Sequence, residues 1–206
     1  TSPSTYLTRT NVTDPTNEKI LTLSFWFKRT TRLNTTCNLY DTFDGSNNNS
    51  RGIISFNSTG KIIVAIQTSS SYNHQIEAFP SYVFRDIGSW YHIVIAMDAG
   101  STNPLLIFVN NTEIVGPNSL APTVNTFTQP WMNQGGNSYQ SIGKGSDNTE
   151  VFTGYLSDIY FIDGQKLDPT HFAHSHPSTG RWSPKRYQGT YGTNGFHLEF
   201  KNTGTH

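Results

Sequence analysis

The sequence predicts an all-β protein, a two-sheet antiparallel β-sandwich with one short helical turn. Short segments in which apolar and polar residues alternate recur along the 206 residues, and turns rich in Asn, Gly and Pro separate them. No segment shows the period of an amphipathic helix. Aromatic residues make up 13% of the chain against 34% for all hydrophobic residues, so rings are expected to fill much of the core.

The segment 152–164 is expected to be a central strand, because apolar residues fall on both of its faces. Strict alternation assigns its apolar residues to two faces: Phe152, Leu156, Tyr160 and Ile162 on one, and Tyr155, Ile159 and Phe161 on the other. Asp168 and Pro169 follow as the N-cap and first position of a short helical turn that ends near Phe172.

Strand patterns also fill the N-terminal half. A short strand at 6–9 is followed by one at 21–29, whose alternation predicts a buried face formed by Leu21, Leu23, Phe25 and Phe27. Trp26 lies on the opposite face, either covered by another layer or exposed as a ligand platform. A Trp in the middle of a strand is seldom left to water, which favours the covered position.

The middle of the chain predicts further antiparallel strands. They comprise 38–43, a hairpin of 52–57 and 61–68 over Ser58-Thr59-Gly60, a central strand at 90–97, and a return at 105–109 that turns through Asn110-Asn111. The segment 116–136 has three prolines and no periodicity, so it is expected to cover a sheet or build a site. The last strand, 196–201, is expected to pair with the opening strand.

Several motifs in this order resemble a known family. They are the segments 89–98, 105–112, 141–143 and 152–172, together with the opening 4–9, the strand 22–29 and the closing segment 187–196. The first four resemble the laminin-G-like branch of the concanavalin A-like lectin/glucanase jelly rolls. A closer resemblance is to jelly-roll modules in virion proteins of marine tailed bacteriophages, which carry segments similar to 4–9, 22–29, 161–169 and 187–196. The resemblance implies one concanavalin A-like domain over residues 1–206, located in the virion.

Composition limits the partners that the chain can have. Fourteen basic residues balance fourteen acidic ones, so no basic excess favours nucleic acid, and no apolar run is long enough for membrane insertion. Cys37 is expected to be a buried bystander in a strand. Because the chain starts at Thr1, we expect a module or processed part of a longer polypeptide.

An enzyme of this fold would need paired carboxylates. By the resemblance, glycosidases of this fold carry a Glu-x-Asp-x-Glu or Glu-x-Asp-x-x-Glu strand, and no such triplet occurs here. Four glutamates have no acidic partner two residues away: Glu77, Glu113, Glu150 and Glu199. Asp158 and Asp163 are an odd number of residues apart and should project to opposite faces. The family that the chain resembles commonly has an acid at the position of Asp158 that ties the strand to nearby backbone, so we expect Asp158 to be a structural carboxylate. Because the carboxylate pair is missing, we do not expect an enzyme.

Metal binding has two weak candidates. His171, His174 and His176 could cluster, although exposed loop histidines are the better interpretation. Asp41, Asp44 and Asn47 or Asn48 offer oxygen ligands for calcium, but their spacing matches no known calcium loop. We expect no cofactor and keep calcium as an alternative.

Carbohydrate binding has the strongest physical case, because sugars stack their C–H faces on aromatic rings while their hydroxyls bind amides and carboxylates. The loop 128–139 combines both, and a second tryptophan follows near residue 181. The predicted site residues are Trp131, Asn133, Gln134, Asn137, Tyr139 and Trp182. The alternative is that both tryptophans cover core edges.

The expected function is therefore a non-catalytic bacteriophage virion module that binds host-surface carbohydrate or decorates the particle. Its partners would be a host-surface glycan and other virion proteins, and many copies would act together, since single sugar contacts are weak. A purely structural capsid or tail protein is the alternative, and a glycan hydrolase is a lesser one.

Overall fold

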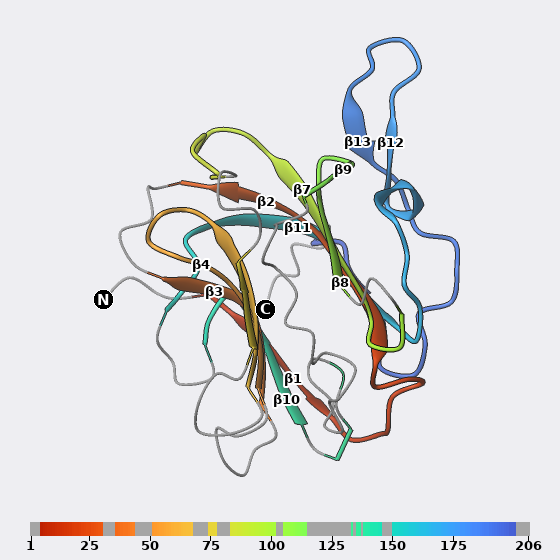
Figure 1. Cartoon of the computed structure of the whole chain (residues 1–206). Coiled ribbons are helices and arrows are strands. Elements are labelled where there is room, and N and C mark those ends of the chain that lie inside the picture. Colours follow the sequence, from red (N-terminus) through yellow and green to blue (C-terminus); the bar gives the residue numbers. More distant parts are fainter. Residues whose placement is uncertain are drawn as a thin grey trace, which may run out of the picture.

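Two antiparallel sheets of six strands each face one another across the core (Figure 1). The computed structural model describes residues 5–30, 36–43, 51–67, 74–77, 83–101, 105–114, 133, 135–136, 138–145 and 150–200. The predicted two-sheet sandwich is confirmed.

The first sheet has the order β1-β10-β3-β4-β5-β6 and the second the order β14-β11-β2-β7-β8-β9. The strands of the first sheet are β1 (Leu7–Asn11), β10 (Ser138–Ile142), β3 (Cys37–Phe43), β4 (Arg51–Phe56), β5 (Ile62–Gln67) and β6 (His74–Glu77). Those of the second are β14 (Phe196–Leu198), β11 (Gly154–Asp163), β2 (Ile20–Arg29), β7 (Tyr91–Asp98), β8 (Leu105–Val109) and β9 (Thr112–Glu113). A two-stranded hairpin, β12 (Ala173–Ser175) and β13 (Trp182–Pro184), stands outside the second sheet (Figure 1).

Aromatic rings from both sheets form the core between them. The inward residues of β2 are the ones that alternation predicted, and none of them exposes more than 1% of its surface: Leu21, Leu23, Phe25 and Phe27. The ring centroid of Phe27 lies 4.9 Å from that of Phe56, 5.3 Å from that of Phe84 and 5.4 Å from that of Tyr91. The expected ring-rich core is confirmed.

Strand β11 is an interior strand, as predicted, but its faces differ from strict alternation. Its register against β2 shifts between Ser157 and Tyr160, so two residues of β11 oppose one residue of β2. Asp158 occupies this bulge with a φ of 48°. Because of the extra residue, Leu156 faces the main core with Ile159, whereas Tyr160 faces outward. Placing Leu156 and Tyr160 on one face was therefore wrong.

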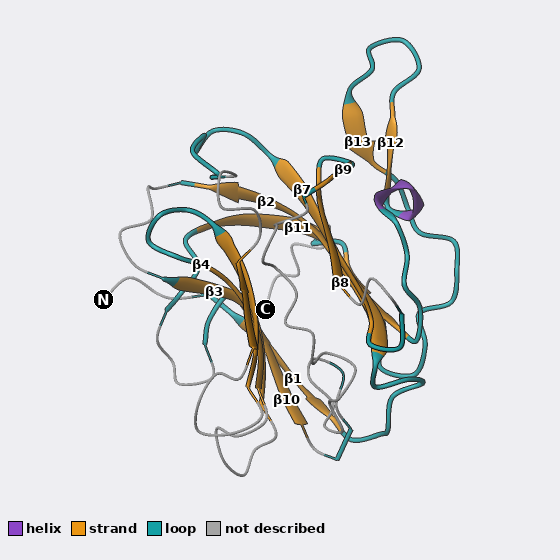
Figure 2. Ribbon diagram, viewed as in Figure 1, coloured by secondary structure: helices purple, strands orange, loops and turns teal. Residues whose placement is uncertain are grey.

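The short helical turn is confirmed as a 3-10 helix, Pro169–His171, drawn in purple in Figure 2. Asp168 is its N-cap, and a side-chain oxygen of Asp168 accepts a hydrogen bond from the backbone N–H of Thr170 at 2.8 Å. None of the helical residues in the described ranges forms a segment long and apolar enough to cross a membrane.

The two ends of the chain do not pair with each other. Strand β1 pairs with β10, and β14 pairs with β11 in the other sheet, so the expected pairing of the first and last strands was wrong. The ends meet through side chains instead, because Arg9 donates from Nη1 to the carbonyl of Asn194 at 2.8 Å. Both end strands are short and half exposed, and such patterns do not specify a partner.

Candidate functional site

Three side chains from neighbouring strands form a row on the outer face of the second sheet. Ser157 of β11 lies opposite Trp26 of β2, and Trp26 lies opposite His92 of β7. The Trp26 ring stacks on the His92 ring with centroids 4.9 Å apart and planes 15° apart. Trp26 exposes 8% of its surface, so the prediction that it is covered is confirmed.

The outer hairpin β12–β13 is attached to this row by a hydrogen bond to His92. The indole N–H of Trp182 donates to His92 Nδ1 at 3.0 Å, and His92 Nε2 lies 2.8 Å from Ser24 Oγ. An indole nitrogen is only a donor, so Nδ1 must be the unprotonated nitrogen and Nε2 carries the hydrogen. Burial lowers the pKa of His92 to about 3, which keeps the imidazole neutral near pH 7.

A hollow of about 200 Å³ opens between this row and the hairpin. Its lining consists of Trp26, Trp90, Ser157, Asp158, Arg181, Trp182, Ser183 and Pro184. We call it the tryptophan hollow. Trp26 contributes to it from the sheet, Trp182 from the hairpin, and Trp90 from the segment before β7.

The lining combines the two kinds of surface that a saccharide requires. Trp90 is 40% exposed, so its ring remains open to a ligand. Nearby, Lys28 Nζ lies 5.5 Å from the Trp90 ring centroid and 5.0 Å from that of Tyr155. Arg181 adds five N–H donors and Asp158 adds carboxylate acceptors. Rings can stack on the apolar faces of a sugar, while the charged groups bind its hydroxyls.

Asp158 is presented to the hollow by a strained backbone. A φ of 48° is uncommon for a residue other than glycine and costs about 1–3 kcal/mol. The side chain accepts a hydrogen bond from Ser157 Oγ at 2.8 Å, rather than tying the strand to neighbouring backbone. Residues held in such conformations cluster at functional sites, so the strain agrees with a ligand-binding role.

A second carboxylate lies near Asp158, with a histidine between them. His197 Nε2 is 3.6 Å from Asp158 Oδ1, and His197 Nδ1 is 3.7 Å from Glu199 Oε1. Burial lowers the pKa of His197, although Glu199 and Asp158 act in the opposite direction. Sequence spacing could not reveal these neighbours, because the pairing of β11 with β14 brings them together. Of the two carboxylates, Asp158 lines the tryptophan hollow.

The residues predicted from the sequence are not gathered into one site. Trp182 lines the tryptophan hollow, whereas Tyr139 lies half-buried on β10 of the other sheet. Asn133 is fully buried, and its Nδ2 donates to Asp163 Oδ1 at 2.6 Å and to the Asn17 carbonyl at 3.2 Å. Trp131, Gln134 and Asn137 lie outside the described residues, and their role in binding stays a prediction.

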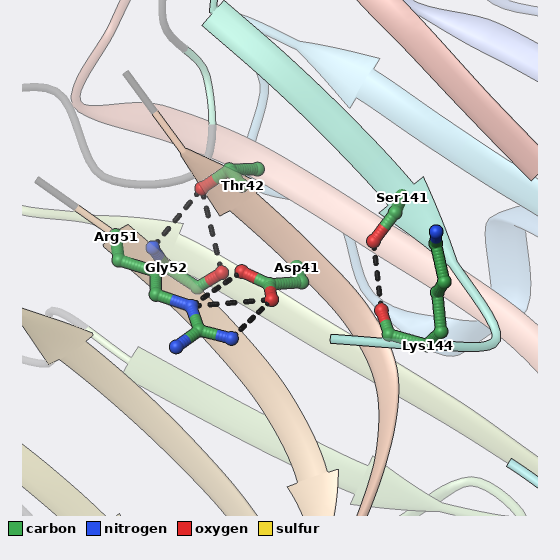
Figure 3. Close-up of polar contacts among 6 residues, drawn as sticks. All are labelled: Asp41, Thr42, Arg51, Gly52, Ser141 and Lys144. Carbon is green, nitrogen blue, oxygen red and sulfur yellow. Dashed lines mark hydrogen bonds and ion pairs between the residues drawn. The ribbon is translucent and has the colours of Figure 1, made fainter. Parts of the chain in front are cut away.

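The candidate metal ligands do not form a metal site among the described residues. Asp41 is buried against Arg51, whose Nε donates to both carboxylate oxygens, at 2.9 Å and 3.1 Å (Figure 3). Asp44, Asn47 and Asn48 lie outside the described ranges. His171, His174 and His176 are exposed. Within the described residues, no three His, Cys, Asp or Glu side chains are grouped to hold a metal ion.

The two facing antiparallel sheets define a concanavalin A-like β-sandwich. The chain belongs to the concanavalin A-like lectin/glucanases superfamily, whose family model matches residues 1–169. No curated protein matches the sequence.

Two solved structures illustrate the shared fold. The native heptameric SAP-like pentraxin from Limulus polyphemus is 17% identical, with a TM-score of 0.53 over 81% of this chain and 73% of that one. Domain 4 of AbnA, a GH43 extracellular arabinanase from Geobacillus stearothermophilus solved in complex with arabinotriose, is 15% identical. Its TM-score is 0.51 over 78% of this chain and 66% of that one. At these identities the likeness concerns the fold.

Proposed function

We propose that this protein is a non-catalytic carbohydrate-binding module whose ligand occupies the tryptophan hollow. The observation that carries the proposal is the convergence of Trp26, Trp90 and Trp182 from three separate segments, beside Asp158 and Arg181. A buried structural tryptophan needs no charged neighbours, whereas a sugar needs both a ring to stack on and groups that bind its hydroxyls.

The size of the hollow indicates a shallow contact with one terminal sugar residue. Its volume of about 200 Å³ is below the roughly 300–1,000 Å³ of sites that enclose a drug-sized ligand. Such a contact is weak on its own, and many copies on one assembly would make it useful. The arabinanase domain that shares this fold was solved with a bound oligosaccharide, which supports the same class of ligand here.

We place the module on the surface of a bacteriophage virion, where it binds a host-surface glycan and contacts other virion proteins. This location is supported by the resemblance of the opening, the central strand and the closing segment to phage virion modules. The two alternative functions predict different outcomes for the hollow. A purely structural capsid or tail protein would leave the hollow without a ligand, and a glycan hydrolase would use Asp158 with a second carboxylate.

A glycan array with the folded, multimerised protein tests the proposal, run with and without calcium and with host lipopolysaccharide and capsule preparations. We expect binding that Trp90→Ala abolishes, since this exposed ring can be removed without opening the core. Trp131→Ala tests the predicted loop 128–139 in the same assay. Binding lost with Trp131→Ala but kept with Trp90→Ala would move the site to the loop 128–139. No binding by any sample would leave the structural role, and cleavage of a bound glycan would establish the hydrolase.

A further inference from the structure

Arg29, the last residue of β2, is buried at one end of the sandwich. It exposes 3% of its surface. It follows Phe25 and Phe27 at a spacing of two, so it continues the inward face of the strand. A guanidinium is therefore placed where the pattern of β2 would otherwise place an apolar side chain.

This buried cation has no counter-charge in the part of the chain that the structure describes. Over the described residues, Arg29 makes no side-chain hydrogen bond, ion pair or ring contact, and its Nε is enclosed without an acceptor. Cys37 and Tyr91 lie near it, but both keep their protons near pH 7, since burial raises the pKa of each. Arginine stays protonated in proteins, so the charge cannot be relieved by losing a proton.

Arg51 shows how the same fold treats a buried arginine that has a structural role. It is 7% exposed, and Asp41 accepts hydrogen bonds from its Nε and Nη2 (Figure 3). Buried charges in proteins are normally paired in this way, because an unpaired one is strongly destabilising. Arg29 lacks such a partner among the described residues, so its guanidinium is available to an acceptor that a ligand brings.

A cavity of about 400 Å³ lies beside Arg29 and provides the space for that acceptor. We call it the arginine cavity; its lining is Arg29, Ser58, Thr59, Gly60, Val83, Phe84 and Arg85. Two of these residues are cationic and none is acidic. Gly60 has a φ of 81°, and a Cβ there would come within 3.2 Å of Val83 Cγ1, so the tight turn between β4 and β5 needs glycine at this position.

We propose that the arginine cavity binds an oxyanion, the carboxylate, sulfate or phosphate group of a ligand. Arg29 supplies the buried charge, exposed Arg85 supplies a second charge, and the Ser58 hydroxyl, which makes no hydrogen bond to the described residues, supplies a donor. Guanidinium groups suit all three anions because their paired N–H donors match two oxygens at once. The site is independent of the tryptophan hollow, since Arg29 and Trp26 lie on opposite faces of β2.

Thermal unfolding with sodium sulfate, phosphate or acetate tests the proposal, each compared with sodium chloride at equal ionic strength. We expect a saturable rise in the melting temperature of the parent with at least one oxyanion, and the three salts distinguish tetrahedral from planar anions. Arg29→Met should weaken this binding by about tenfold or more. Lys19→Gln is the matched control, since it removes one exposed positive charge about 30 Å away, just before the other end of β2, and should respond like the parent.

Arg85→Gln provides a second test that does not depend on the folding of Arg29→Met, because Arg85 is exposed. It should weaken oxyanion binding while leaving the melting temperature in chloride unchanged. The proposal is overturned if none of the three oxyanions stabilises the parent more than chloride does. It is also overturned if Arg85→Gln shows the same oxyanion-dependent rise in melting temperature as the parent, and Arg29→Met, where it folds, does so too.

Discussion

Acid should destabilise this protein through His92, the residue that attaches the outer hairpin to the second sheet. The folded pKa is about 3 against an ordinary value of 6.5, so between these limits the unfolded chain binds a proton that the folded chain does not. Stability is therefore fully present above pH 6.5 and is lost as the pH falls toward 3. Between pH 7.5 and pH 5, the free energy of unfolding falls mainly over the roughly 1.5 pH units below 6.5. At about 1.4 kcal/mol for each pH unit, the loss is about 2 kcal/mol.

Urea unfolding at both pH values, followed by tryptophan fluorescence, measures this loss. His92→Gln does not titrate and can still hydrogen-bond to Trp182 and Ser24. We expect the parent to lose about 2 kcal/mol more than the variant between pH 7.5 and pH 5. His197 contributes a change of the same sign to both proteins, so it cancels in the comparison. Equal losses in parent and variant would refute the assigned neutral state of His92.

Three further outcomes follow from single residues. Asp163→Asn should lower the free energy of unfolding in urea by about 2–4 kcal/mol. The Asp163 carboxylate accepts hydrogen bonds from the backbone N–H groups of Thr16, Asn17 and Asn194 and from the Asn133 side chain. A loss below about 1 kcal/mol would contradict this network. Asp158→Gly should raise stability by about 1 kcal/mol by relieving a φ of 48° while weakening saccharide binding; stabilisation with unchanged binding would remove Asp158 from the site. Burial raises the pKa of Cys37 to about 11, so iodoacetamide should label it at pH 8 only after unfolding, and rapid labelling of the native protein would disprove its burial.

Local patterns predicted the fold because each strand carries its own signal. The alternation in β2 identified its buried face, and the apolar character of 152–164 identified an interior strand. The turn residues Asn110 and Asn111 have the positive φ values, 46° and 70°, that their side chains tolerate. The bulge at Asp158 could not be foreseen, because it exists only relative to the register of β2.

The site was harder to predict because its parts are distant in the sequence. Searching for aromatic and amide residues within one segment favours the loop 128–139. The tryptophan hollow instead draws Trp26, Trp90 and Trp182 from three segments, and strand pairing brings them together. Trp182 was singled out for its chemistry, but nothing local indicated that His92 would hold its indole. The unpaired charge of Arg29 was equally hidden, since a strand ending in arginine usually exposes it.

The most direct test of carbohydrate binding in the tryptophan hollow is an NMR titration of the indole N–H groups. The chain has four tryptophans, so a ¹⁵N-labelled sample gives four resolvable indole signals that single substitutions assign. Adding the saccharide selected on the array should shift the signals of Trp90 and Trp182 in a saturable way. A saturable shift confined to Trp131, or no shift of any indole, would contradict a saccharide site in the hollow.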